Sequence, residues 1–251
     1  MKKTVLVATM YSGEGDFDRC CEMVKAQSWG CEHLIIKNLP EVEAHLQLYK
    51  TFKESGHDFL LKLDADMVLK SKDTVKLIVG RMGDFWRVTH YVDDYFTGMK
   101  MNGIHMFSSK NKWDFDGFTP DCLKPDRLDI LHTQRKRYKH KQKTRGDMLA
   151  YHCHYSNDRQ AFHFGYHSLL KHEHKRLGKF LTHYDKHPSD NKLQMVGRGI
   201  LAARNSMCYN SYDYNDGFDK IFAENNKRSI SPDRATRMVK SGLESVRENR
   251  E

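Results

Sequence analysis

The feature that most constrains the fold is a regular alternation of short apolar runs and amphipathic segments over the first 84 residues. Residues 4–10, 31–37 and 59–63 are apolar and rich in residues that favour strands. Between these runs, apolar residues recur every three to four positions, the spacing of one helix face. Strands that alternate with helices form a parallel sheet covered on both faces. The sequence therefore predicts an α/β fold with a mostly parallel, Rossmann-like central sheet flanked by helices.

Turn and capping residues support these boundaries. Asp16 is a predicted N-cap, and Gly56 is placed to end the second helix. Ser71 is expected to cap a third helix that Gly83 closes. After residue 84 we expect strands at 85–91 and 104–108, a loop over 111–130, a helix at 160–174 and a last helix from Ser231.

Composition narrows the class of protein. The 251 residues suit one large α/β domain, and the net charge of +9 favours anionic partners. The six cysteines form no Cys-x-x-Cys pair, so a zinc ribbon is not indicated. No apolar stretch approaches the roughly 18 residues of a membrane span, so a cytoplasmic location is expected.

One Asp-x-Asp pattern stands out by its context. The pattern occurs three times, at Asp16/Asp18, Asp64/Asp66 and Asp114/Asp116. Only Asp64/Asp66 follows an apolar strand of the predicted parallel sheet, and ligands of such sheets bind at the carboxyl ends of the strands. In an extended Asp-Ala-Asp both carboxylates lie on the same side. They would suit a hard cation, Mn²⁺ or Mg²⁺, while the alternative is a pair of solvated or capping acids.

Three segments together resemble a known family. Thr9-Met10-Tyr11, the stretch LIIKNL and the stretch FLLKLDADMVL are similar to the nucleotide-binding half of GT-A-fold glycosyltransferases, especially family-2-like ones. The stretch LAYHCHYSNDRQAFHFGYHSLLK (149–171) resembles the C-terminal part of small bacterial and viral members. The resemblance implies a single GT-A domain. Residues 1–110 would be the nucleotide-sugar-binding half, and residues 111–251 the acceptor-side region with a basic segment and C-terminal helices.

The resemblance also implies roles for matching residues. Thr9 and Tyr11 would hold the nucleobase and ribose. Asp64 would contact the ribose or, through water, the metal, and Asp66 would bind the metal directly. His152 is expected to complete the metal site, with His154 as the alternative. Members of this family often carry an acid after the second strand to bind the base. Here Lys37 and Asn38 occupy that region, and Lys37 becomes the candidate contact.

The sequence leaves more than one candidate for the catalytic base and more than one role for the basic segment. An inverting enzyme needs a carboxylate base near the acceptor hydroxyl. Asp93 and Asp94 are the candidates because they follow a predicted strand, with Asp114 and Asp116 as alternatives. Residues 134–145 carry seven Lys or Arg and no acid. This run is either a solvated loop or a mobile segment that closes over the diphosphate or docks on an anionic acceptor or membrane surface.

The function predicted from these features is transfer of a sugar from a nucleotide sugar, expected to be UDP-linked, to a hydroxyl of a glycan, lipid or protein. A sugar nucleotidyltransferase is the first alternative, but residues 11–16 are acidic where such enzymes carry a basic phosphate loop. The second alternative is a non-catalytic basic binding module. A nucleic-acid partner is not expected, because no known nucleic-acid-binding motif is present.

Overall fold

The computed structural model describes residues 3–119, 122, 125–170, 174–205, 216–225 and 231–237. The chain forms two compact units, and each is described by itself. Unit 1 contains Met1–Asp93 and Lys100–His152, and unit 2 contains Asp94–Met99 and Cys153–Glu251. The expected boundary near residue 110 separates a donor-binding half from an acceptor-side region. It describes substrate binding and not packing, and it stays a prediction.

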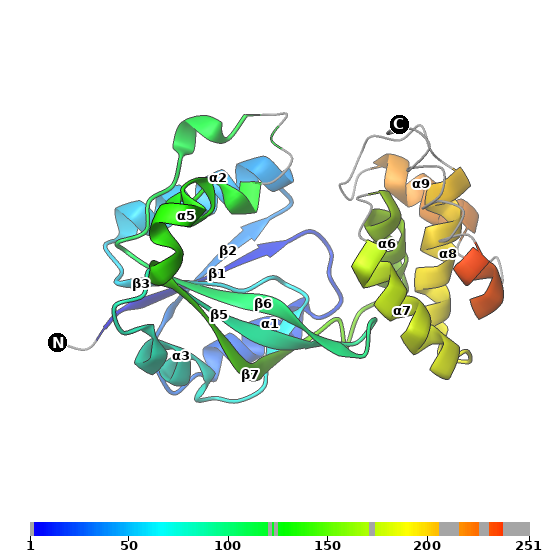
Figure 1. The fold of residues 1–251 in the computed structure, drawn as a ribbon, viewed down its shortest axis with the longest axis horizontal. Helices are drawn as coiled ribbons and strands as arrows, with labels where there is room; N and C mark the ends of the chain where they lie inside the picture. Colours follow the sequence, from blue (N-terminus) through cyan, green and yellow to red (C-terminus); the bar gives the residue numbers. More distant parts are fainter. Residues whose placement is uncertain are drawn as a thin grey trace. The chain divides into compact units, whose positions relative to one another are not determined.

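A seven-stranded sheet forms the centre of unit 1, in the order β2-β1-β3-β6-β5-β7-β4 (Figure 1). Its strands are β1 (Val5–Tyr11), β2 (Glu32–Lys37), β3 (Phe59–Lys62), β4 (Met67–Leu69), β5 (Arg87–Asp94), β6 (Met99–Ser108) and β7 (Gln142–His152). Strand β1 is parallel to β2 and to β3, whereas β6 runs antiparallel to β3 and β7 runs antiparallel to β4. The predicted α/β class is confirmed, and the parallel arrangement covers the three N-terminal strands.

Helices lie on both faces of this sheet, as the strand–helix alternation predicts. They are α1 (Phe17–Lys25), α2 (Glu41–Ser55) and α3 (Thr74–Met82). Successive side chains of β1 point to opposite faces. Val5 and Val7 therefore pack in one core with residues of α1 and α3, while Leu6 and Ala8 pack in another with residues of α2. Figure 1 shows α2 and α3 on opposite sides of the strands.

The two predicted glycines end their helices as expected. The N-terminal caps of α1 and α3 differ from the predicted ones. Gly56 follows α2 at φ 71° and Gly83 follows α3 at φ 45°, both left-handed values that favour glycine. Asp16 occupies the N-cap position of α1, but its buried side chain makes no capping hydrogen bond. The N-cap of α3 is Asp73, whose backbone N–H donates to Ser71 Oγ at 3.1 Å. Ser71 thus orders the residues before the helix.

The basic segment is part of unit 1 and contains helical turns and the start of a strand, while its role in binding stays a prediction. It spans α5 (Arg135–Tyr138), a 3-10 turn (Lys139–Lys141) and the start of β7. The Tyr138 ring stacks on Trp86 with centroids 5.0 Å apart, and the Trp86 backbone N–H donates to Lys141 O at 2.7 Å. Sequence patterning missed β7 because the first half of this strand is mostly exposed and charged. The expected loop at 111–130 also contains two 3-10 turns and the start of α4, with bounds Phe115–Gly117, Pro125–Arg127 and Ile130–Thr133.

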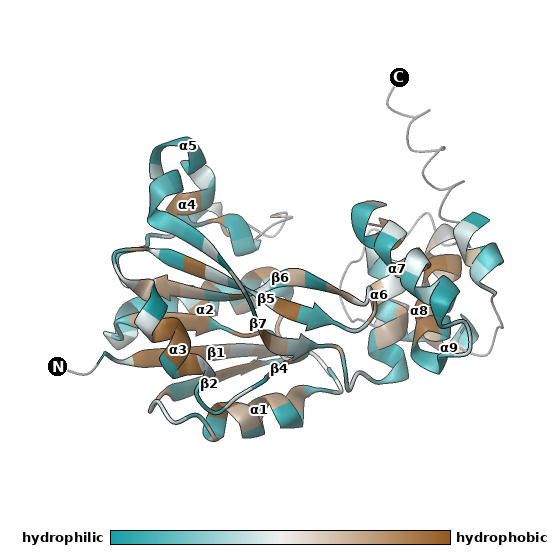
Figure 2. Ribbon diagram, turned by 60° about the horizontal axis from the view of Figure 1, so that its bottom comes forward, coloured by the Kyte–Doolittle hydropathy of each residue, from teal (hydrophilic) through white to brown (hydrophobic). Residues whose placement is uncertain are grey.

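Unit 2 is helical. It contains α6 (Asp158–Leu170), α7 (His174–Lys186), α8 (Asn191–Asn205) and α9 (Asp216–Asn225), and residues 232–237 are also helical. The helix expected at 160–174 is thus α6, while residues 171–173 of that prediction lie outside the described residues. Figure 2 shows hydrophobic residues along α8 and hydrophilic ones recurring along α7. Among the helices in the described part of the chain, none is long and apolar enough to cross a bilayer.

Helices α6 and α8 cross closely at two glycines. A Cβ atom added at Gly165 would lie 2.0 Å from the backbone oxygen of Val196. A Cβ atom added at Gly199 would lie 2.0 Å from the backbone oxygen of Phe162. Because the obstructing atoms are backbone atoms, neither side chain rotation nor a small shift can make room. The absence of a side chain at both positions sets the distance between the two helices.

We predict that Gly165→Ala destabilises the fold by about 1–3 kcal/mol, the usual range for overpacked cores. Urea unfolding followed by circular dichroism at 222 nm measures this change. Gly178→Ala on α7 is the matched control, because a Cβ atom there meets nothing within 4 Å. That change should raise stability slightly, since alanine favours a helix over glycine by up to about 1 kcal/mol. Equal effects of the two substitutions would contradict a close α6–α8 crossing.

Candidate active site

The Asp64-Ala65-Asp66 segment forms a turn between β3 and β4. The Met67 backbone N–H donates to Asp64 O at 3.0 Å, so the segment is a tight turn and is not extended. The expectation that an extended segment holds both carboxylates on one side is therefore wrong. After the turn the chain enters β4, an edge strand that pairs with β7 and is separated from β3 in the sheet by β6, β5 and β7. As a result, Asp64 and Asp66 have different partners.

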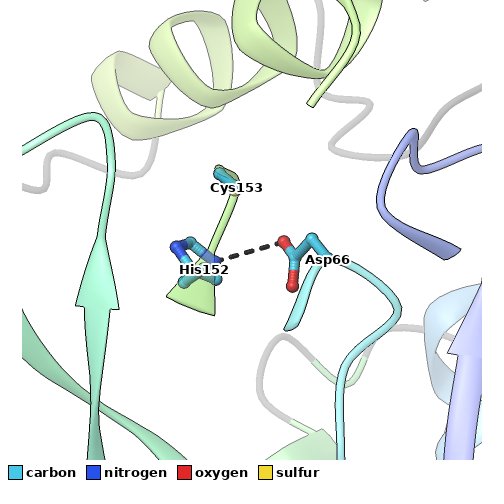
Figure 3. Close-up of side chains that lie close together, drawn as sticks. All are labelled: Asp66, His152 and Cys153. Carbon is cyan, nitrogen blue, oxygen red and sulfur yellow. Dashed lines mark ion pairs between the residues drawn. The ribbon is translucent and has the colours of Figure 1, made fainter. Parts of the chain in front are cut away.

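Asp66 contacts His152, the residue predicted from the sequence to complete a metal site. The pairing of β4 with β7 aligns Met67 with His152, which brings the preceding Asp66 beside the imidazole. Asp66 Oδ2 lies 3.2 Å from His152 Nε2 (Figure 3). The Asp66 side chain is 23% exposed and that of His152 is 6% exposed, so the pair lies at a partly accessible position. Cys153 follows directly in the chain, and ligand atoms of all three residues lie within 4.8 Å of one another.

Asp66 and His152 fit a divalent cation. Two ligand atoms that each lie about 2.1 Å from one ion, at an angle of roughly 90–110°, are about 3.0–3.4 Å apart. The observed separation of 3.2 Å falls in this range. A carboxylate suits Mn²⁺ or Mg²⁺, whereas an imidazole and a thiol suit softer ions such as Zn²⁺. The donor set thus supports a divalent metal and leaves its identity to experiment.

Asp64 is held by a lysine from the preceding strand. Lys62 Nζ donates to Asp64 Oδ1 at 2.6 Å, and the two side chains are 11% and 38% exposed. Burial acts to raise the pKa of Asp64, but the Lys62 ammonium outweighs it and holds that pKa below its usual value. Burial likewise acts to lower the pKa of Lys62, and the charge of Asp64 raises it on balance. Asp64 is therefore ionised and already paired, unlike a carboxylate reserved for a metal.

Two histidines beside this pair are neutral at pH 7. Burial, assisted by the Lys62 charge, lowers the pKa of His105 to about 3 and that of His45 to about 4. The His105 ring lies 3.0 Å from Thr89 Oγ1, and His45 Nδ1 lies 2.9 Å from Glu41 O. Because neither imidazole is protonated, Lys62 supplies the positive charge next to Asp64.

Glu14 is a site residue that sequence reasoning missed. Burial, assisted by the charges of Asp66 and Asp64, raises the pKa of its carboxyl to about 7. The Ser12 backbone N–H donates to Glu14 Oε2 at 2.7 Å and fixes the side chain within the loop after β1. The acidic loop had been noted in the sequence, but nothing there showed that it approaches Asp66. Lys62 was missed for a similar reason, although a lysine inside an apolar strand was a visible signal.

Tyr11 and Lys37, both predicted to contact the nucleotide, lie together at the ends of β1 and β2. The parallel register pairs Tyr11 with Lys37. The Tyr11 ring stacks on Phe17 with centroids 4.1 Å apart, and Lys37 Nζ lies 5.2 Å from the Phe17 centroid. Thr9 differs, because its fully buried hydroxyl lies 3.0 Å from His33 Nε2. The Thr9 side chain thus bonds within the sheet, whereas Tyr11 is partly exposed and Lys37 is exposed.

The two candidate catalytic acids have separate environments. Asp93 is 35% exposed at its side chain and pairs with Lys70 at 3.2 Å. Asp94 is fully buried, and its carboxylate accepts hydrogen bonds from the backbone N–H and the hydroxyl of Thr97. Asp94 therefore stabilises the turn that follows β5. The alternatives Asp114 and Asp116 flank Phe115 at the first 3-10 turn, and both are exposed.

His154, the alternative metal ligand, belongs to unit 2. Its ring makes an edge contact with Tyr95 at 5.4 Å between centroids, and its backbone oxygen accepts a hydrogen bond from Lys192 Nζ at 2.9 Å. These contacts lie within unit 2, whereas the imidazole of His152 is the one that reaches Asp66. The geometry therefore favours His152 over His154.

Solved structures with a similar fold are only distantly related. One is the mannosyltransferase PcManGT from Pyrobaculum calidifontis in complex with GDP-Man and Mn²⁺, with 10% identity over 97% of this chain and 80% of that chain and a TM-score of 0.44. Another is a glycosyltransferase involved in the glycosylation of the major capsid of PBCV-1, with 12% identity over 59% and 94% and a TM-score of 0.41. A third is A197 from STIV, with 12% identity over 59% and 85% and a TM-score of 0.42. No family model and no curated protein matches the sequence. At these values the likeness carries no conclusion about activity.

We predict that Asp64→Ala destabilises the fold by about 2–3 kcal/mol because it leaves the Lys62 ammonium largely buried without its partner. Lys62→Met should cost less, and the double variant should recover much of the loss. Urea unfolding of the four proteins in a double-mutant cycle measures the coupling. Additive effects of the two substitutions would show that the ion pair contributes nothing.

We also predict that stability falls between pH 7 and pH 5. The folded-state pKa of His45 is lowered to about 4, so the unfolded chain binds more protons below about pH 6.5. At pH 5 this difference costs about 2 kcal/mol for one such histidine. His45→Met should flatten the dependence of the melting temperature on pH, whereas His140→Met, at an exposed position, should leave it unchanged. Identical pH profiles for both variants and the parent protein would refute the assignment.

Proposed function

We propose that the chain is a metal-dependent glycosyltransferase that moves a sugar from a nucleotide sugar, UDP-linked in this proposal, to a hydroxyl of a glycan, lipid or protein. The observation that carries the proposal is the contact between Asp66 and His152, two residues 86 positions apart that meet at 3.2 Å. Carboxylate and imidazole at this spacing are suited to one divalent cation.

The strand directions support a common nucleotide site. Strands β1 and β3 are parallel, and Ala8 is paired with Lys62. The residues that follow both strands therefore lie beyond the same edge of the sheet, which is the usual place for ligands of open α/β sheets. Tyr11 and Lys37 would contact the nucleobase and ribose there, with Asp64 at the ribose.

Asp66 and His152 would hold the cation. A bound cation neutralises the charge that develops on the diphosphate leaving group as the sugar–oxygen bond breaks. The residues of the chain would orient the donor: Lys62 keeps Asp64 ionised and fixed, and Glu14 adds a second acid near Asp66. This division leaves Asp66 as the carboxylate committed to the metal.

Asp93 is the acceptor base in this proposal. Its carboxylate is partly exposed, whereas that of Asp94 is buried and bonded to Thr97. Asp93 would have to exchange its ion pair with Lys70 for the acceptor hydroxyl. A carboxylate base at the acceptor hydroxyl belongs to an inverting reaction, so a product with retained configuration would contradict this role for Asp93.

A sugar nucleotidyltransferase is the rival activity. Its triphosphate substrate would have to approach the loop after β1, where Glu14 lies close to Asp66 and Asp64. Residues 11–16 of this loop contain two acids and no Lys or Arg, whereas such enzymes usually carry a basic phosphate loop there. Release of pyrophosphate from a nucleoside triphosphate and a sugar phosphate would favour the rival and contradict the glycosyltransferase proposal.

We predict that UDP with Mn²⁺ raises the melting temperature by about 5 °C at saturating concentration, because a ligand at 100 times its dissociation constant adds about 2.7 kcal/mol. A panel of UDP, GDP and CDP with Mn²⁺, Mg²⁺, Zn²⁺ or EDTA identifies the base and the metal. Asp66→Ala and His152→Ala should remove the metal-dependent part of the shift. Asp116→Ala, an exposed acid of another Asp-x-Asp pattern, should retain it.

The same variants test the chemistry. Hydrolysis of the donor in the absence of acceptor should fall at least about 100-fold in Asp66→Ala, because several kcal/mol of charge stabilisation are lost with the cation. Full activity of Asp66→Ala would sink the proposed site, and no binding of any nucleotide with any metal would favour a non-catalytic binding module.

A further inference from the structure

Unit 2 contains a pocket that the proposed function does not use. Its volume is about 420 Å³, and it lies between the turn after β5 and one side of α7. Its lining includes Lys175, Lys179, Lys186, His183, Thr97 and Gly98. All of these residues belong to unit 2, so the pocket is defined within one compact unit.

The three lysines form one stripe on α7. Lys175, Lys179 and Lys186 are separated by four and seven residues, and Thr182 occupies the intermediate position. Residues at these spacings lie on the same side of a helix. The side chains of all three lysines are exposed, and none forms an ion pair with any residue that the structure describes. Three uncompensated ammonium groups therefore face one cavity.

The opposite wall is a rigid turn. The buried carboxylate of Asp94 accepts hydrogen bonds from Thr97 N–H and Thr97 Oγ1 and so fixes the turn. Gly98 has φ +60°, and a Cβ atom there would lie 2.5 Å from His183 Nδ1. The backbone at Gly98 therefore lies so close to the His183 ring that no residue with a side chain would fit there without displacing it. The pocket is formed by the fold and does not depend on the lysine side chains alone.

The carboxylates near the pocket are directed elsewhere. None of the lining residues is an acid. Asp190 accepts hydrogen bonds from the Tyr95 hydroxyl at 2.5 Å and from the backbone N–H of Lys192 at 2.9 Å. The described lining therefore has a positive charge that Asp94 and Asp190 are not directed to neutralise, and a ligand with several negative charges would do so.

We propose that this pocket binds a phosphate-bearing ligand with more than one negative charge. Lysine ammonium groups bind phosphate as point charges, and three of them line this pocket. Lys175 and Lys179 lie about 6 Å apart along the helix axis, which suits two phosphate groups or one diphosphate better than a single charge. The ligand is either a soluble phosphorylated compound or the phosphate headgroup of a lipid. The proposal stands on unit 2 and does not rest on the sugar-transfer activity.

The test uses pyrophosphate and the full chain carrying Asp66→Ala, in buffer with EDTA. These conditions remove metal-dependent binding at the proposed donor site, so the two proposals can fail separately. Isothermal titration at low salt should show binding that weakens about fivefold in Lys179→Gln, the contribution of one lysine near an anionic surface. Lys220→Gln on α9 removes an equally exposed charge outside the pocket and should leave the affinity unchanged.

A second variant separates the pocket from diffuse charge. Gly98→Ala removes no charge but displaces His183, so it should weaken pyrophosphate binding severalfold if the pocket is the site. Equal loss in Lys179→Gln and Lys220→Gln, with no loss in Gly98→Ala, would overturn the proposal in favour of non-specific attraction.

Vesicles distinguish the source of the phosphate. Co-sedimentation with phosphatidylcholine vesicles that contain phosphatidic acid, lost in Lys179→Gln and absent with pure phosphatidylcholine, would assign the site to a lipid headgroup. Binding of pyrophosphate without vesicle binding would assign it to a soluble compound. If neither probe binds, the proposal is wrong.

Discussion

The antiparallel pairing of β4 with β7 is the interaction on which the candidate site depends. Strand β4 has only three residues, yet its register with β7 places Asp66 beside His152. A shift of one residue would turn the side chains of β7 to the other face and remove the imidazole from the carboxylate. The hydrogen bonds of this short ladder thus determine whether a metal site exists.

The two carboxylates of the Asp64/Asp66 motif have different charged partners. Asp64 is neutralised by Lys62 from the adjacent strand, whereas Asp66 contacts an imidazole and lies near the acid Glu14. Two carboxylates that differ by two positions in the sequence therefore have different electrostatic environments. The one beside a fixed ammonium is suited to hold a polar ligand, and the one surrounded by other metal-binding groups is suited to hold a cation.

In unit 2, close packing and surface charge are arranged on different helices. Gly165 and Gly199 let α6 and α8 approach until their backbones touch, which fixes a rigid helical pair. Helix α7 packs Leu177, Phe180 and Tyr184 into the same core and turns its lysines outward. The buried face specifies where α7 lies, so the exposed face can carry unpaired positive charge at little cost to folding.

The sequence by itself determined the α/β class, the three parallel strands and the glycine ends of two helices, whereas the choice of Asp66 as a metal ligand stays a prediction. These features depend on local periodicity and on residues with special backbone conformations. Strand β7 and Lys62 were not predicted from local pattern, since the first half of β7 is mostly exposed and polar and Lys62 is a lysine within an apolar run.

Only the tertiary structure decided which side chains meet. In the structure Asp66 contacts His152, and Lys62 pairs with Asp64. Glu14 lies near the same carboxylates. Thr9 and Asp94 form hydrogen bonds inside the fold. Such contacts join residues far apart in the chain, and their geometry follows from strand register and burial. A single sequence contains no local signal for either, because both arise only when the whole sheet is packed.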